Sequence, residues 1–295
     1  MDGAGAIALI AFALLLAINQ VTIKLVNEGL QPVFFAGLRS VGGAICMVIW
    51  IKIRGRGFEL PPGTAIWGVM IGLVFAIEFI ALFVALDLTT VSRTSVIFYS
   101  MPLWLAVAAH FVLPGEKIHA TKAAGLVLAF VGVAWAILVR GSDAMDQASI
   151  LGDIAALVGA WGWAAVALIV RASPLKTVRP EMQNFLQLVW SIPFLMLAAP
   201  LFGPFVRDLA PIHFGYMLFQ IVAIVSFGFL FWIWLLTIYR AAEVAAFSFL
   251  SPIFGILLGW LLLGEQVPAS TLVAGAMVAL GLVLINLRPR VFVRP

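Results

Sequence analysis

Ten long apolar stretches, separated by short polar connections, decide what this chain can fold into. Each is about 20 residues long or longer, the length that an α-helix needs to cross the hydrocarbon core of a bilayer. They are residues 7–26, 32–51, 65–86, 91–113, 121–139, 150–170, 180–201, 212–237, 241–263 and 268–287. The connections leave no room for a separate soluble domain, so we predict an all-α membrane protein with ten transmembrane helices.

The composition supports lipid as the solvent. Of the 295 residues, 64% are hydrophobic and 10% are charged, whereas soluble domains are roughly 45–50% apolar and about 25% charged. The residues before the first apolar stretch carry no Lys or Arg. Because a cleavable signal peptide begins with a positively charged region, we expect the first stretch to stay in the protein as a transmembrane helix.

The positions of Lys and Arg predict the orientation. If the amino terminus lies inside, the inner connections and ends carry twelve Lys and Arg, and the outer ones carry four. Positive charge is enriched on the cytoplasmic side of membrane proteins. We therefore expect a multi-pass protein of a cell membrane, such as the bacterial inner membrane, with both termini in the cytoplasm. Outside the apolar stretches there is no basic surface of the kind that binds nucleic acid, so nucleic acid is excluded as a partner.

A sequence repeat divides the chain into two halves. Tyr99-Ser-Met-Pro-Leu-Trp, followed by Gly-Glu116, returns in the second half as Phe249-Leu-Ser-Pro-Ile-Phe, followed by Gly-Glu265. Each half therefore contains five apolar stretches. Because five is odd, the second half must enter the membrane from the opposite side, which gives two inverted five-helix repeats. Transporters with such repeats bind their substrate near the middle of the membrane.

The repeated motifs resemble the EamA-type repeats of the drug/metabolite transporter superfamily. The matching positions are Pro102, Glu116, Gly125 and Gly132 in the first half and Pro252, Glu265, Gly275 and Gly281 in the second. The resemblance assigns residues 1–141 and 150–288 to the two repeats. Amino-acid exporters of the YddG kind have this length and helix number. The resemblance implies a secondary transporter that exports small metabolites, foremost amino acids including aromatic ones, by alternating access.

Six polar side chains from five of the predicted helices fall at a similar depth. With a rise of ~1.5 Å per residue, they lie roughly 9–13 Å below the outer ends of their stretches. They are Asn19, Gln20, Arg39, Glu78, Tyr99 and Gln220. Polar groups are costly within a bilayer, so each is a candidate for a functional site. We expect this polar layer to line the outer half of the transport path.

Arg39 and Glu78 are the charged members of the polar layer. The planar guanidinium of Arg39 suits a carboxylate, and Glu78 offers a negative charge to an ammonium group. Together they would bind a zwitterion such as an amino acid. The alternative is that the two side chains pair with each other, or that Arg39 hydrogen-bonds to helix ends and loops.

Gln187 is the counterpart of Arg39 in the second half. It follows Pro180 at the same spacing as Arg39 follows Pro32. In an inverted repeat it should lie nearer the inner face. We expect it either in a matching polar layer or among the solvated residues of an inner vestibule.

Aromatic and proline residues add two further expectations. Tyr99 and Trp163 could form the aromatic wall of a small-molecule cavity, although either could instead pack between helices. Pro102 and Pro252 fall within predicted helices at equivalent positions of the two halves. Proline removes a backbone donor and bends a helix. We interpret the two prolines as hinges of gates on opposite sides of the membrane, with static kinks as the alternative.

Other functions stay open as alternatives. Another metabolite, such as a nucleotide sugar or a drug-like amine, could be carried. A membrane-embedded enzyme acting on lipid would need clustered acids, histidines or cysteines, and a channel would need an ion-coordinating ring or a re-entrant loop. The sequence shows neither pattern, and it contains no metal-ligand cluster, Walker motif or nucleophile motif. We therefore expect a transporter without enzymatic activity, metal or cofactor. Its partners would be a small-molecule substrate and lipid, and it would act as a monomer or, alternatively, as a dimer.

Overall fold

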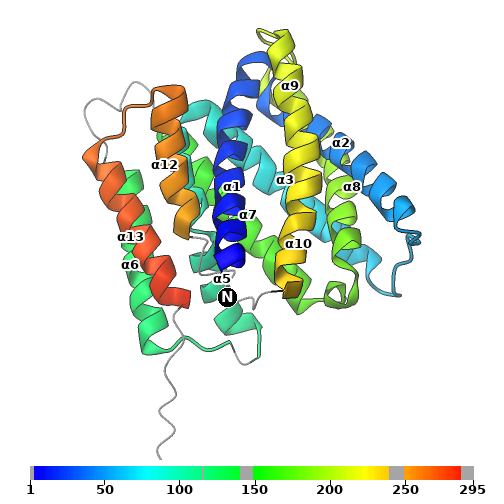
Figure 1. Cartoon of the computed structure of the whole chain (residues 1–295), viewed down its shortest axis with the longest axis horizontal. Helices are drawn as coiled ribbons and strands as arrows, with labels where there is room; N and C mark the ends of the chain where they lie inside the picture. The colour runs from blue at the N-terminus through cyan, green and yellow to red at the C-terminus, as the bar shows by residue number, and fades with distance from the viewer. Residues whose placement is uncertain (1–2, 115, 140–148, 239–248, 287–295) are drawn as a thin grey trace, which may run out of the picture.

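The computed structural model describes residues 3–114, 116–139, 149–238 and 249–286, and these ranges are almost entirely helical (Figure 1). In chain order the helices are α1 (Gly3–Gly29), α2 (Pro32–Ile53), α3 (Ala65–Leu88), α4 (Val91–Phe98), α5 (Met101–Val112), α6 (Ala120–Leu138), α7 (Ile150–Ala172), η2 (Pro174–Thr177), α8 (Pro180–Ala198), η3 (Ala199–Phe202), α9 (Pro211–Phe219), η4 (Gln220–Gly228), α10 (Phe229–Ile238), α12 (Leu250–Leu263) and α13 (Ala269–Asn286).

The described residues contain nine helices that are long and apolar enough to cross a membrane. In this count α4 and α5 form one span, α8 and η3 form another, and α9, η4 and the start of α10 form a third. The tenth predicted span, 241–263, is described only from Phe249 onward, where α12 forms a shorter apolar helix. Residues 241–248 lie outside the described ranges. The prediction of an all-α membrane protein is confirmed.

Successive spans run in alternating directions between two faces of the helix bundle (Figure 1). One face carries the start of α1 and the connections α2–α3, α5–α6 and α7–α8. We call it the basic face because the described Lys and Arg residues of these connections lie there: Lys52, Arg54, Arg56, Lys117, Lys122, Arg171, Lys176 and Arg179. The opposite face carries the connections α1–α2, α3–α4, α8–α9 and α12–α13. Helix α1 starts at the basic face and α7, the first helix of the second half, starts at the opposite face, so the halves are inverted as predicted.

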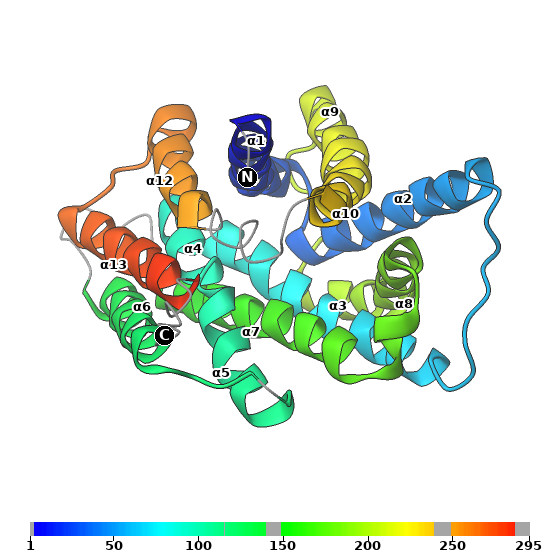
Figure 2. The same cartoon turned by 60° about the horizontal axis from the view of Figure 1, so that its bottom comes forward.

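The two halves interlock instead of forming separate bodies. Helix α3 packs along α7 and α8, α2 packs on α8, α4 packs on α12, and α6 lies beside α13 (Figure 2). Glycines allow these close approaches: a Cβ at Gly72 would lie 2.3 Å from the Trp190 Cβ, and one at Gly125 would lie 2.7 Å from the Gly281 carbonyl oxygen. Small residues commonly mediate contacts between transmembrane helices, and here they join the first half to the second.

The fourth predicted span is broken into two helices. Helix α4 ends at Phe98, Tyr99 and Ser100 form a turn, and α5 begins with Pro102 in its first turn. Proline is tolerated there because the first N–H groups of a helix lack partners within that helix. Pro102 therefore lies at a junction between two helices and not within one bent helix. Pro252 likewise lies in the first turn of α12. Their role as hinges stays a prediction.

The eighth predicted span is continuous but irregular. Between α9 and α10, residues Gln220–Gly228 form the π-helical segment η4. Such segments are rare and frequently occur at functional sites. Gln220, a member of the predicted polar layer, is the first residue of this segment.

Candidate functional site

Three members of the polar layer form a connected network where α1, α2 and η4 meet. Gln220 Nε2 donates a hydrogen bond to the Asn19 carbonyl oxygen at 3.0 Å and a second one to Thr22 Oγ1. Arg39 Nη2 lies 3.4 Å from Asn19 Oδ1, at the long end of hydrogen-bond distance. Asn19, Arg39 and Gln220 are all buried. The structure thus brings together three helices that the sequence related only by depth.

A second set of hydrogen bonds attaches the α4–α5 junction to α1. Ser95 Oγ donates to Gln20 Oε1 at 2.6 Å, and Tyr99 Oη donates to the Leu16 carbonyl oxygen at 2.7 Å. Gln20 Nε2 has no hydrogen-bond partner among the described residues. Gln20 follows Asn19 in α1, and Tyr99 contacts α1 one turn away at Leu16. The three residues therefore lie at a similar depth, as expected from the sequence.

The guanidinium group of Arg39 packs against two phenylalanine rings. The guanidinium carbon lies 4.7 Å from the ring centroid of Phe79 and 5.6 Å from that of Phe83, in the range of cation–π interactions. Only 4% of the residue is exposed. Its Nε and Nη1 atoms have no hydrogen-bond partner in the part of the chain that the structure describes. Two strong donors are therefore left for another group to bind.

Glu78 lies near Arg39 but does not form an ion pair with it. No nitrogen–oxygen distance of 4.0 Å or less joins the two side chains among the ion pairs of the described residues. Glu78 is 4% exposed, and within the described ranges its Oε2 atom has no hydrogen-bond partner. A Cβ at Gly162 of α7 would lie 2.7 Å from the Glu78 Cβ. Glu78 is therefore situated where α3 of the first half meets α7 of the second.

Trp163 and Tyr99 belong to one aromatic cluster. The Trp163 ring stacks on Phe98 with 5.3 Å between centroids, and it meets Tyr99 edge-on at 6.2 Å. Trp163 is half-buried, whereas Phe98 and Tyr99 are buried. The cluster joins α7 to the α4–α5 junction. This arrangement is compatible with both interpretations from the sequence, an aromatic cavity wall and packing between helices.

Gln187 lies apart from the polar layer. It is one helical turn from Ser191, which hydrogen-bonds to Ser40 beside Arg39, so it lies about 5 Å nearer the basic face. The Gln187 side chain is half-buried and forms no hydrogen bond with the described residues. On the same helix, Asn184 Nδ2 lies 3.5 Å from the Val225 carbonyl oxygen. The position fits the expected second layer, but nothing links it to Arg39.

The sequence analysis missed a buried ion pair between α4 and α7. Arg93, one of the four Lys and Arg counted from the sequence at the outer connections and ends, is 1% exposed. Its Nε and Nη2 atoms contact Asp153 Oδ1 and Oδ2 at 3.1 and 2.7 Å, and Nη2 also donates to the Ala136 carbonyl oxygen. One signal was available in the sequence: both residues lie close to the outer ends of their predicted spans, so they share a depth.

The opposite face is closed above the polar layer. Lys24 Nζ donates to the carbonyl oxygens of Leu86 and Thr89 at 3.0 and 2.7 Å, which ties α1 to the end of α3. Arg207 forms two hydrogen bonds to the Asp87 carboxylate at 2.6 and 3.0 Å. These bonds raise the pKa of Arg207 above its ordinary value. Side chains and connections from both halves therefore cover the network.

Burial differs between the two ends of the fourth span. All eight residues of α4, toward the opposite face, are buried. In the twelve residues of α5, toward the basic face, only Leu103, Ala106 and Ala109 are buried. The fourth span is thus more deeply buried between the polar layer and the opposite face than toward the basic face.

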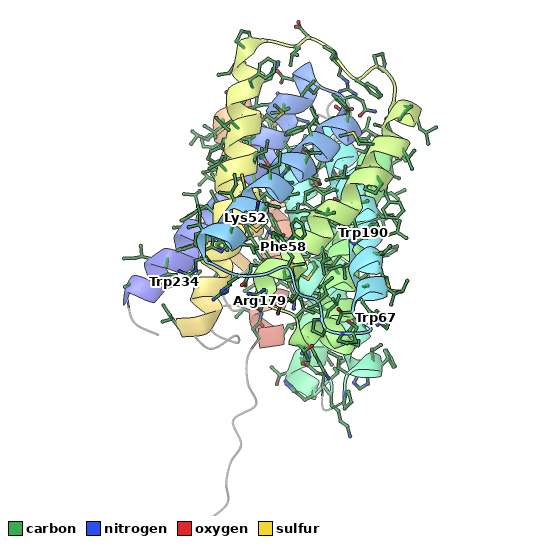
Figure 3. All side chains as sticks on the ribbon, turned by 90° about the vertical axis from the view of Figure 1, so that its right-hand side faces the viewer. Lys52, Phe58, Trp67, Arg179, Trp190 and Trp234 are labelled. Carbon is green, nitrogen blue, oxygen red and sulfur yellow. The ribbon has the colours of Figure 1, made fainter. Side chains whose placement is uncertain are left out.

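A separate shallow pocket lies on the basic face. Its volume is about 380 Å³, and its lining includes Glu59 and Arg179. Arg179 Nη2 donates to the Gly57 carbonyl oxygen at 2.5 Å, and Phe58 packs on Phe185 with 5.2 Å between ring centroids. Phe58 and Arg179 are both labelled in Figure 3, on the side of the molecule that faces the viewer. None of the predicted site residues lines this pocket. The described residues contain no group of three or more His, Cys, Asp or Glu that could hold a metal ion.

Comparison with known proteins identifies the relatives of this fold. The model of the EamA-like transporter family matches the chain twice, over residues 3–138 and 150–287. The uncharacterized transporter YoaV of Bacillus subtilis is 22% identical over 285 residues, which cover 94% of each chain. A probable amino-acid metabolite efflux pump of Escherichia coli is 25% identical over 279 residues, or 90% of this chain and 89% of that protein. One solved crystal structure has a TM-score of 0.66 at 17% identity, covering 97% of this chain and 98% of that chain, which concerns the fold alone.

Proposed function

The chain belongs to the EamA-like transporter family, and from this premise we propose that it exports small zwitterionic metabolites, foremost amino acids, through the polar layer around Arg39. Membership makes the chain a multi-pass membrane transporter of metabolites, and the names of its relatives favour a transporter over an enzyme. The observation that carries the narrower proposal is a buried arginine with two donors that no described residue accepts from.

The carboxylate of the substrate binds to Arg39. Leaving a buried donor without a partner costs about 1–3 kcal/mol, and Arg39 has two such atoms, Nε and Nη1. Phe79 and Phe83 hold the guanidinium in place by its face. A substrate carboxylate would accept hydrogen bonds from the free donors and would supply the charge that Glu78 does not bring within ion-pair distance.

The ammonium group of the substrate binds near Glu78. The carboxylate of Glu78 has an oxygen without a donor among the described residues. Because Arg39 and Glu78 are close but unpaired, a molecule that carries both charges can lie between them. The aromatic cluster of Phe98, Tyr99 and Trp163 lies beside the adjoining part of α1 and would contact the substrate side chain.

The direction of transport follows from the orientation of the two faces. We assign the basic face to the cytoplasm, because positive charge favours that side, and the membrane to the bacterial inner membrane. With the opposite face closed, substrate would enter from the cytoplasm. The E. coli relative, named a probable amino-acid metabolite efflux pump, supports export of this substrate class. A single chain contains both halves of the path, so we propose a monomer as the working unit.

Counterflow in proteoliposomes tests the substrate class. Vesicles are loaded with one unlabelled amino acid, and entry of the same labelled amino acid is measured while other compounds compete. We expect saturable counterflow that free amino acids inhibit. The corresponding decarboxylated amines and amino-acid amides should inhibit at least about tenfold less, because one charge-assisted hydrogen bond is worth about 1.5–3 kcal/mol. Equal inhibition by amines and amino acids would contradict a carboxylate site, and flux without saturation would indicate a channel.

A further inference from the structure

At the opposite face, the glutamate of the second Gly-Glu motif, Glu265, forms hydrogen bonds to the first half outside the proposed binding site. Glu265 follows α12 and is 5% exposed. Its Oε1 accepts a hydrogen bond from the Val91 N–H at 2.5 Å. Its Oε2 accepts from the Ser92 N–H at 2.9 Å and from Ser92 Oγ at 2.7 Å. A carboxylate of the second half thus caps the start of α4 in the first half.

These contacts are strong for physical reasons. The first N–H groups of a helix have no acceptor within that helix, and the helix dipole places partial positive charge there. Hydrogen bonds to an ionised carboxylate are roughly twice as strong as those between neutral groups. Gly264 directs Glu265 toward α4, since it ends α12 with a φ of 63°, a left-handed conformation that favours glycine.

Next to Glu265, helices α4 and α12 are packed tightly against each other. A Cβ at Gly255 of α12 would lie 1.9 Å from Ser95 Oγ, and one at Gly259 would lie 2.4 Å from Glu265 Oε2. Ser95 in turn hydrogen-bonds to Gln20 of the polar layer. Helices α4 and α12 therefore touch along the route from the polar layer to the opposite face. A path to that face along this route requires them to separate.

Helix α4 is a short segment that contacts both halves: besides the bonds to Glu265, its Arg93 pairs with Asp153 of α7. It is eight residues long, and the turn at Tyr99 and Ser100 separates it from α5. Its amino-terminal end contacts the second half through Glu265, and its carboxyl-terminal end meets the junction at Pro102. A rotation about this junction would move α4 away from α12 only if the bonds to Glu265 break.

Glu116, the counterpart of Glu265 in the first half, makes different contacts. Glu116, on the basic face, has a side chain that is 35% exposed, and it forms ion pairs with Arg171 and, at 4.0 Å, Lys122. Such exposed pairs contribute about 0–1 kcal/mol. Glu265 thus caps a helix of the other half, while its counterpart Glu116 forms partly exposed ion pairs. This difference agrees with the tight packing of the opposite face.

From these contacts we propose that Glu265 is the latch of the gate on the opposite face, whose three hydrogen bonds to Val91 and Ser92 hold α4 against α12. Loss of the carboxylate charge shifts the transporter toward the form that is open to this face. The proposal does not depend on the identity of the substrate, so its test needs none. It can therefore fail while the proposed amino-acid export stands, and the reverse also holds.

A buried reporter on α12 tests the latch. Leu258→Cys is introduced after Cys46→Ala, because Cys46 is the single native cysteine. Leu258 is 8% exposed and lies between Gly255 and Gly259. The protein in lipid nanodiscs, without substrate, is treated with a bulky polar maleimide. In Glu265→Gln, whose amide places a donor against backbone donors, we expect the labelling rate of the introduced thiol to rise about tenfold.

Two matched variants complete the experiment. Ser92→Ala removes one of the three hydrogen bonds and should raise the rate about twofold to threefold, whereas Glu116→Gln, the counterpart on the basic face, should leave it unchanged. If Glu265→Gln is not monodisperse, the comparison of Ser92→Ala with Glu116→Gln decides. The proposal is overturned if the latch variants label at the parent rate, or if Glu116→Gln labels as fast as they do.

Discussion

Individual residues of the candidate site were predictable by depth but not by partner. Helical rise placed Asn19, Arg39 and Gln220 in one layer, and the structure joins them by hydrogen bonds. Depth does not determine the rotation of a helix or the side-chain conformation. The sequence therefore left open whether Arg39 pairs with Glu78, and it could not show the two phenylalanine rings beneath the guanidinium.

Arg93 shows why a charge near the end of a span can be misjudged. Counting it as an outer charge did not alter the orientation, but the residue is buried with Asp153. Removing one partner of a buried ion pair costs about 3–5 kcal/mol. We expect Asp153→Asn to lower the thermal unfolding midpoint of the detergent-solubilised protein by several degrees, as measured by differential scanning fluorimetry.

Glu116→Gln provides the control for this prediction. Its ion pairs are partly exposed, so the midpoint should shift little. Equal shifts in the two variants would mean that the Arg93–Asp153 pair contributes no more to stability than a surface pair does.

At the scale of elements, the apolar stretches predicted the spans well because long apolar runs have few alternatives in lipid. The span 91–113 shows the limit of this approach. Pro102 indicated a disturbance, yet the chain turns three residues earlier at Tyr99, where the hydroxyl contacts α1. The π-helical start of η4 had no signal in the sequence, and neither had the hydrogen bonds that join its first residue, Gln220, to α1.

Contacts between α4 and α12 predict a large effect of one added methyl group. Gly255→Ala would place Cβ 1.9 Å from Ser95 Oγ, so the two helices must move apart. We expect the unfolding midpoint to fall and, in the Leu258→Cys background, thiol labelling to increase. Gly215→Ala is the matched control, since no other atom lies within 4 Å of the added Cβ. Alanine also favours the helix by up to about 1 kcal/mol. A Gly255→Ala protein as stable as Gly215→Ala would show that this contact is not tight.

The whole molecule is an interlocked pair of inverted halves. The odd number of helices per repeat predicted the inversion, and the structure adds close contacts between the halves such as that of Gly125 with Gly281. The sequence could not predict that one face is closed. That property depends on Lys24, Glu265 and Arg207, whose polar contacts cross between connections far apart in the chain.

The assignment of the basic face to the cytoplasm predicts how the chain lies in the cell membrane. With Cys46 replaced by Ala, we introduce Leu201→Cys on the opposite face, where Leu201 is 83% exposed. Glu59→Cys provides an exposed site on the basic face. In intact cells, a membrane-impermeant maleimide should label position 201 and not position 59, and cell lysis should make both reactive. The reverse pattern would contradict the proposed orientation.

The central claim is that Arg39 binds the carboxylate of the transported metabolite, and one comparison tests it most directly. Counterflow of a labelled amino acid is measured in proteoliposomes that contain the parent protein, Arg39→Gln or Arg54→Gln. Arg54 directly follows the last residue of α2 and is exposed on the basic face. We predict that Arg39→Gln lowers counterflow at least about tenfold, as expected from the loss of a charge-assisted contact, and that Arg54→Gln does not change it. Equal counterflow in folded Arg39→Gln and Arg54→Gln proteins would contradict the account.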